Sequence, residues 1–105
     1  MTRVVFYADN SRLYGFKVSG HSSFDCEDQE GKIVCSAVSS AVYMTANTLT
    51  EIIGEKCDIQ INDGEFLLKA SMEKKETEQL LKGLKLHLTE LSHEYPKRIK
   101  ITAEV

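Results

Sequence analysis

Two residue types that can do nucleophilic chemistry together lie fourteen positions apart in the first third of the chain. His21 stands where a strand pattern ends, and Cys35 stands where a helix pattern begins. A thiol at a helix N-terminus lies at the positive end of the helix dipole, which favours the thiolate. A nearby imidazole can hold the thiol proton or form an ion pair with the thiolate. The two residues therefore predict a cysteine nucleophile with a histidine partner.

Each of the two residues also has a purely structural interpretation. Cys35 shares a helical face with Val38 and Val42, and a buried cysteine often acts as a small apolar side chain. A single histidine at a strand end is most often a surface residue. The pairing of His21 with Cys35 across one intervening loop favours the catalytic interpretation.

The other cysteines are weaker candidates for a nucleophile. Cys26 lies among Asp25, Glu27 and Asp28, whose charges oppose thiolate formation. A reversible Cys26–Cys35 disulfide would instead make the protein a thiol redox sensor, and this alternative stays open.

The remaining histidines and Cys57 are expected to have structural or surface positions. Cys57 falls on the apolar face of a predicted strand, and His87 and His93 lie among lysines and glutamates. We expect no metal and no cofactor, because the spacing of His21, Cys26 and Cys35 matches no zinc pattern with closely paired ligands.

Length and composition favour one soluble domain over residues 1–105. Apolar residues make up 42% of the chain and charged residues 28%, as in ordinary globular proteins. The net charge of -3 argues against direct nucleic-acid binding. No apolar run is long enough to cross a membrane, and the odd number of cysteines favours free thiols, so we expect a cytoplasmic protein.

The hydrophobic periodicity predicts seven elements. A hairpin is followed by a long acidic loop, a helix that Gly54 ends, a second hairpin around Asn62-Asp63-Gly64, a helix that Ser71 caps, and a last strand. The predicted ranges are strands 4–8 and 13–19, loop 20–32, helix 33–53, strands 57–61 and 66–70, a second helix up to Tyr95-Pro96, and strand 99–103.

The order of these elements predicts an α+β two-layer sandwich of type ββαββαβ. We expect a mostly antiparallel five-stranded sheet with two helices on one face. The other face must then be polar or be covered by a second subunit. Because the first strand has apolar residues on both faces, a homodimer is expected.

Two segments together resemble the signature of a bacterial family. Gly20-His21-Ser22 and Gly31-Lys32-Ile33-Val34-Cys35-Ser36-Ala37-Val38-Ser39 are similar to the pattern of the ribosomal-processing cysteine protease Prp family. That pattern is close to G-H-A, a variable loop and G-x-D-I-V-C-A-A-V-S. The resemblance covers nearly the whole chain, because length and element order also agree.

The resemblance implies a cysteine peptidase with a histidine–cysteine dyad. His21 would be the general acid and base, and Cys35 the nucleophile. The implied substrate is the N-terminal extension of a bacterial large-subunit ribosomal protein, the twenty-seventh in the standard list. Members of the family are similar in being small homodimers.

The chain departs from the family pattern at two positions. Ser22 replaces an alanine, and Lys32 replaces the aspartate three residues before the cysteine. If that aspartate orients the histidine, then Asp28 or Glu30 must do so here, and the sequence does not choose between them. Alternatively, Lys32 stabilises the thiolate electrostatically.

The expected reaction is that of a thiol peptidase, with backbone N–H groups around Ser36 as donors to the oxyanion. The competing hypothesis, besides the redox sensor, is an interaction module of the translation apparatus in which Cys35 only packs in the core.

Overall fold

The computed structural model describes residues 1–20 and 28–104. The chain order is ββαββαβ, with a π-helical segment directly after the first helix. In sequence the elements are β1 (Thr2–Asp9), β2 (Arg12–Ser19), α1 (Gln29–Asn47), η1 (Thr48–Ile53), β3 (Cys57–Asn62), β4 (Glu65–Ala70), α2 (Glu76–Glu94) and β5 (Ile99–Glu104). The predicted order of elements is confirmed.

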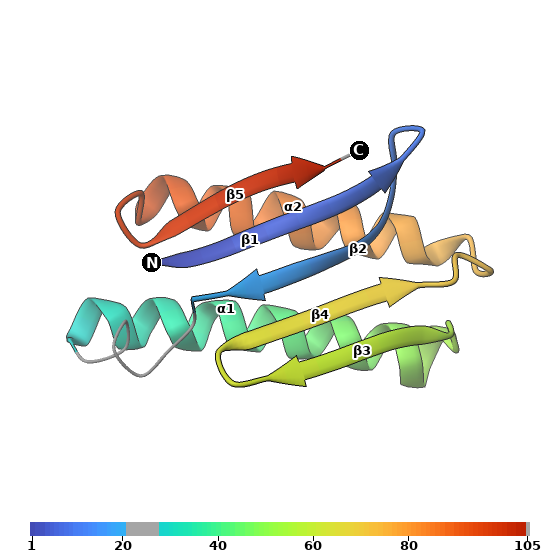
Figure 1. Cartoon of the computed structure of the whole chain (residues 1–105), viewed down its shortest axis with the longest axis horizontal. Coiled ribbons are helices and arrows are strands. Elements are labelled where there is room, and N and C mark those ends of the chain that lie inside the picture. Colours follow the sequence, from blue (N-terminus) through green and yellow to red (C-terminus); the bar gives the residue numbers. More distant parts are fainter. Residues whose placement is uncertain (21–27, 105) are drawn as a thin grey trace.

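The five strands form one sheet in the order β3-β4-β2-β1-β5. The pairs β1–β2, β2–β4 and β3–β4 are antiparallel, and β1–β5 is parallel. Figure 1 shows α1 and α2 side by side behind the sheet, with the other face open. The predicted α+β sandwich, with a mostly antiparallel sheet and both helices on one face, is therefore confirmed.

The core lies between the sheet and the helices. Phe6, Phe16 and Leu68 are directly paired across three strands, and all are 0% exposed. Each fully buried side chain of this size contributes about 2 kcal/mol relative to an exposed one. The helices cover this row with buried valines and leucines: Val34, Val38 and Val42 from α1, and Leu81, Leu84 and Leu88 from α2.

A bulge in the first hairpin reverses one predicted side chain. Strict alternation along β2 would place Tyr14 with Phe16 on the core face, but the register shifts between Tyr7 and Ala8. The ring of Tyr14 stacks on Tyr7, with the ring centroids 6.1 Å apart. Tyr7 directly follows the buried Phe6, so it lies on the open face, and Tyr14 lies there with it.

The first helix begins four residues before the predicted start at 33. Asp28 is the N-cap, and its side chain accepts a hydrogen bond from the Gly31 N–H at 2.7 Å. Residues 29–32, which were expected in the acidic loop, therefore form the first turn of α1. Of the remainder of that predicted loop, residues 21–27 lie outside the described residues.

The end of the predicted first helix also differs from the expectation. The π-helical η1 has a different angular step from an α-helix, so the apolar stripe does not continue unchanged. Leu49 is buried, but Ile52, three residues later, is 79% exposed. Gly54 ends the segment in the left-handed region, with φ of 79°, as predicted.

The start of α2 is organised by a residue that the sequence did not single out. Ser71 was expected to cap the helix, but α2 begins at Glu76, and the Ser71 hydroxyl donates to Glu55 at 2.6 Å. The carboxylate of Glu55 also accepts from Thr77 and from the N–H groups of Glu73 and Lys74. A carboxylate from the preceding connection thus takes the place of the cap.

Candidate functional site

Cys35 lies on the sheet-facing side of α1 and is 8% exposed. It is the seventh residue of the helix, since α1 begins at Gln29. The effect of the helix dipole fades within the first turn, so it supports a thiolate at Cys35 less than a position at the helix start would. The prediction that Cys35 stands at the beginning of the helix is therefore wrong by about one and a half turns.

His21, Ser22 and Cys26 lie outside the described residues, so the proposed dyad and the alternative Cys26–Cys35 disulfide remain predictions. The residue before the histidine is described. Gly20 has φ of 73°, a backbone region that residues other than glycine rarely adopt. A Cβ atom on Gly20 would lie 2.3 Å from the Met1 carbonyl oxygen. The glycine of the G-H pair is therefore required by the backbone at the end of β2.

A hollow of about 140 Å³ joins the end of β2 to the helix that carries Cys35. Val18 of β2 lines it together with Val38 and Ser39, which follow Cys35 by three and four residues. The strand that precedes His21 thus lines the same hollow as the helical turn next to Cys35. The β3–β4 hairpin and the aromatic residues Tyr43 and Phe66 complete the wall, and Tyr43 meets Phe66 edge to face with centroids 5.9 Å apart.

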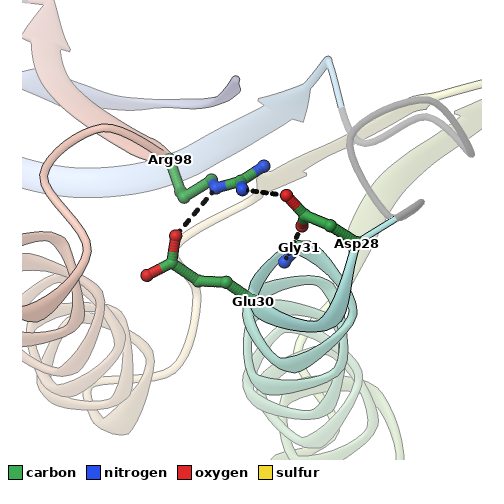
Figure 2. Close-up of polar contacts among 4 residues, drawn as sticks. All are labelled: Asp28, Glu30, Gly31 and Arg98. Carbon is green, nitrogen blue, oxygen red and sulfur yellow. Dashed lines mark hydrogen bonds and ion pairs between the residues drawn. The ribbon is translucent and has the colours of Figure 1, made fainter.

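The two acids offered as substitutes for the family aspartate are bound by an arginine. Figure 2 shows the guanidinium of Arg98 between Asp28 and Glu30. Its Nε donates to Glu30 Oε2 at 3.1 Å, and its Nη2 pairs with Asp28 Oδ2. The Gly31 N–H and the Arg98 guanidinium lower the pKa of Asp28, and the two carboxylates raise the pKa of Arg98. Both acids are therefore already paired with Arg98.

Arg98 was missed in the sequence, because it lies 70 positions after Asp28 in a turn with no motif. Lys32 is exposed on the first turn of α1. Its role in place of the family aspartate stays a prediction.

The expected oxyanion donors around Ser36 are wrong in this structure. Only the first four N–H groups of an α-helix lack a partner within the helix, and Ser36 is the eighth residue of α1. The Lys32 N–H donates to the Asp28 carbonyl, and the Gly31 N–H donates to the Asp28 side chain. The first-turn N–H groups of Gln29 and Glu30 are the ones that the helix itself does not use.

The remaining cysteine and histidines lie where they were expected. Cys57 is half-buried against the core, and burial, with the nearby Glu55 charge, raises the pKa of its thiol. His87 and His93 are exposed on α2. Across residues 1–20 and 28–104, no three potential ligands gather as a metal site would need, and no helix is long and apolar enough to span a membrane.

Comparison with known proteins supplies a family and a fold. A family model described as cysteine protease Prp matches residues 1–100. The structure is similar to that of an essential ribosomal processing protease Prp from S. aureus with a substrate peptide, at 19% identity and a TM-score of 0.88, covering 99% of this chain and 100% of that one.

Two further structures are similar. The S. aureus protease with a covalently linked product peptide has 20% identity and a TM-score of 0.84, covering 99% of this chain and 100% of that one. SMU.848 from Streptococcus mutans has 20% identity and a TM-score of 0.85, covering 98% of this chain and 93% of that one. At these identities the similarity establishes the fold alone. No curated protein sequence matches the chain.

Proposed function

Since the chain belongs to the cysteine protease Prp family, we propose that it is the endopeptidase that removes the N-terminal extension of a bacterial large-subunit ribosomal protein. His21 and Cys35 would form its catalytic dyad, within a single domain of residues 1–105. A similar structure holds a substrate peptide of a ribosomal processing protease, which supports a peptide substrate of this kind.

The observation that carries the dyad is the hollow that β2 and α1 line together. Val18 lies three residues before His21, and it lines the same hollow as Val38 and Ser39, one turn after Cys35. The strand that precedes His21 in the sequence thus shares a hollow with the helical turn that follows Cys35. This arrangement supports an imidazole within reach of the thiol.

The reaction would proceed in two steps on one sulfur. The Cys35 thiolate attacks the carbonyl carbon of the scissile bond and forms an S–C bond, while the C–N bond breaks and protonated His21 gives its proton to the leaving amine. His21 then takes a proton from water, whose oxygen attacks the thioester. The acid product and the Cys35 thiolate are released.

The hollow, lined by the helical turn that follows Cys35, would hold an apolar side chain of the substrate. Its walls are mainly aliphatic and aromatic, and its volume of about 140 Å³ is close to that of cavities of ~150 Å³ that take up benzene. A large apolar residue near the cleaved bond could be seated there.

The test is incubation with the ribosomal protein that carries its intact extension, followed by mass spectrometry of the products. Cys35→Ala should lower the cleavage rate by roughly three orders of magnitude or more, because the nucleophile is gone. Cys57→Ala is the matched control and should cleave like the wild type. Cleavage by a double variant that lacks both His21 and Cys35 would reject the dyad.

Thiol labelling separates the protease from the non-enzymatic interaction module. A nucleophilic Cys35 should react with iodoacetamide faster than Cys57, whose pKa is raised by burial. Equal or slower labelling of Cys35 would favour a cysteine that only packs. A Cys26–Cys35 disulfide that forms under mild oxidant and controls activity would favour the redox sensor.

The protein would act in the cytoplasm as a homodimer. The open face of the sheet supports a second subunit, because it carries a half-buried apolar strip where no helix covers the strands: Val5, Tyr7, Tyr14 and Leu67.

A further inference from the structure

Backbone hydrogen bonds hold Arg98 in place at the turn between α2 and β5. Its N–H donates to the Tyr95 carbonyl at 2.9 Å, and its carbonyl accepts the N–H of Thr2 at 2.8 Å. Thr2 is 1% exposed, so this backbone position is fixed against the buried start of β1. The side chain of Arg98 itself is 27% exposed.

From this position the guanidinium of Arg98 reaches the start of α1. One edge pairs with Asp28, the N-cap of α1, and Nε pairs with Glu30 in the first turn. Figure 2 shows that Asp28 at the same time receives the Gly31 N–H, so that one planar group is linked to both the cap and the first turn. A guanidinium bound to two carboxylates restrains orientation as well as distance.

Among the described residues, few polar contacts join this turn to other elements. The outward residues Gln29, Glu30 and Lys32 are exposed. Within 1–20 and 28–104, the pairs with Arg98 are the ion pairs that connect the first turn of α1 to a different element. The pairs with Arg98 therefore link the start of the helix to the turn that leads into β5.

We propose that Arg98 is a positioning residue for Cys35, acting through Asp28 and Glu30. Cys35 lies seven residues after Asp28, which is two helical turns and about 10 Å along the same face. A misplacement of ~1 Å at a reacting group can lower a rate by ~100-fold. This inference rests on the proposed peptidase function and adds a residue to it.

The carboxylates that Arg98 binds are more than half exposed, and exposed ion pairs contribute little to folding stability. Loss of the guanidinium should therefore leave the fold intact and lower the rate of the chemical step. A residue with a merely structural role would show the opposite pattern, with lower stability and an unchanged turnover number.

The experiment compares Arg98→Met with Arg12→Met, which removes an exposed pair to Glu78 elsewhere. The substrate is the ribosomal protein with its intact extension. For Arg98→Met we expect kcat to fall about 10- to 100-fold with KM within about twofold of the wild type. Arg98→Lys keeps the charge but not the planar, two-sided donor geometry of the guanidinium, so its kcat should lie between those of Arg98→Met and the wild type. Arg12→Met should match the wild type.

A second set of variants tests whether Arg98 acts through α1. Asp28→Asn keeps a capping oxygen, and Glu30→Gln keeps the shape of the side chain, while both remove the charge. In this double-variant background Arg98→Met should change kcat by less than twofold. If Arg98→Met lowers kcat by the same factor as in the wild-type background, Arg98 does not act through these acids, and the inference is wrong.

Failure of the proposed function gives a different result from failure of this inference. If the wild type neither cleaves the substrate nor labels faster with iodoacetamide at Cys35 than at Cys57, both are rejected. If the wild type does both and Arg98→Met keeps its full kcat, only the role of Arg98 is rejected. Urea unfolding of each variant confirms that the compared proteins are folded.

Discussion

Glu55 is the buried charge on which the α2 end of the molecule depends. It is 3% exposed, and burial alone would raise the pKa of its carboxyl. The hydroxyls of Ser71 and Thr77 and the N–H groups of Lys74 and Glu73 outweigh burial and lower the pKa to about 2. Four donors from one segment thus make this carboxylate a stable anion beneath the start of a helix.

The matched variant Glu55→Gln keeps the shape of the side chain and loses the charge. In the variant, the amide NH2 would face donor groups whose hydrogen bonds one carboxylate oxygen of Glu55 accepts in the wild type. We expect a loss of stability on the order of 2 kcal/mol, as for buried hydrogen bonds to a charged group. Urea unfolding at pH 7 measures this, with the exposed Glu51→Gln as the control. Equal stability of Glu55→Gln and the wild type would contradict the role of Glu55.

The same residue predicts a pH dependence with a definite sign. The pKa of Glu55 is lower in the folded protein than the ~4.3 of an unfolded chain. Its contribution is therefore fully present above about pH 4.3 and is lost as the pH falls toward 2. The difference in unfolding free energy between the wild type and Glu55→Gln should shrink between pH 5 and pH 2.5. A difference that stays constant over this range would show that ionisation is not its cause.

At the scale of elements, substitution of two glycines by alanine should change the stability of the protein in opposite directions. Gly54 ends η1 with φ of 79°, whereas Gly83 lies in the middle of α2. A Cβ atom would have nothing within 4 Å at either position. Backbone conformation alone therefore decides how a Cβ atom at either position affects the stability of the protein.

Gly54→Ala should destabilise the protein by about 1 kcal/mol, because a left-handed backbone is strained in alanine. Gly83→Ala should stabilise it by about 1 kcal/mol, because alanine is the better helix former. Thermal unfolding of the two variants measures both effects, which are expected to have opposite signs. If both variants shift the midpoint in the same direction, the backbone account of Gly54 or of Gly83 is wrong.

At the scale of the whole molecule, the two faces of the sheet differ. Both helices cover one face, and the other carries the apolar strip that supports a second subunit (Figure 1). Val5 lies between Lys17 and Thr102 on the neighbouring strands, near the middle of that face.

Sedimentation should give a mass twice the 11.8 kDa of one chain. Val5→Lys should shift the protein to the monomer, because it places a charge in the apolar strip. Leu86→Lys, at a 61% exposed position on α2, is the control and should stay dimeric. A wild-type monomer at all concentrations, or dissociation by Leu86→Lys alone, would contradict a dimer through the open face.

Much of the fold and part of the site follow from local patterns in the sequence. Alternating apolar residues predict Phe16 and Leu68 on buried strand faces, and the 3.6-residue period predicts the buried leucines of α2. These patterns work because burial of one side of an element is encoded within that element. The helix pattern also points to Cys35, because it predicts a helix start just before it, but that start is four residues too late.

The tertiary structure decided what depends on distant parts of the chain. Arg98 meets Asp28 across 70 positions, and Thr77 meets Glu55 across 22, so no local period marks either contact. The bulge that turns Tyr14 outward depends on the pairing of two strands. The sequence by itself determined which side chains are apolar and where they repeat, whereas the partner of each charge was decided when the elements packed, because a charge can be satisfied by any element that reaches it.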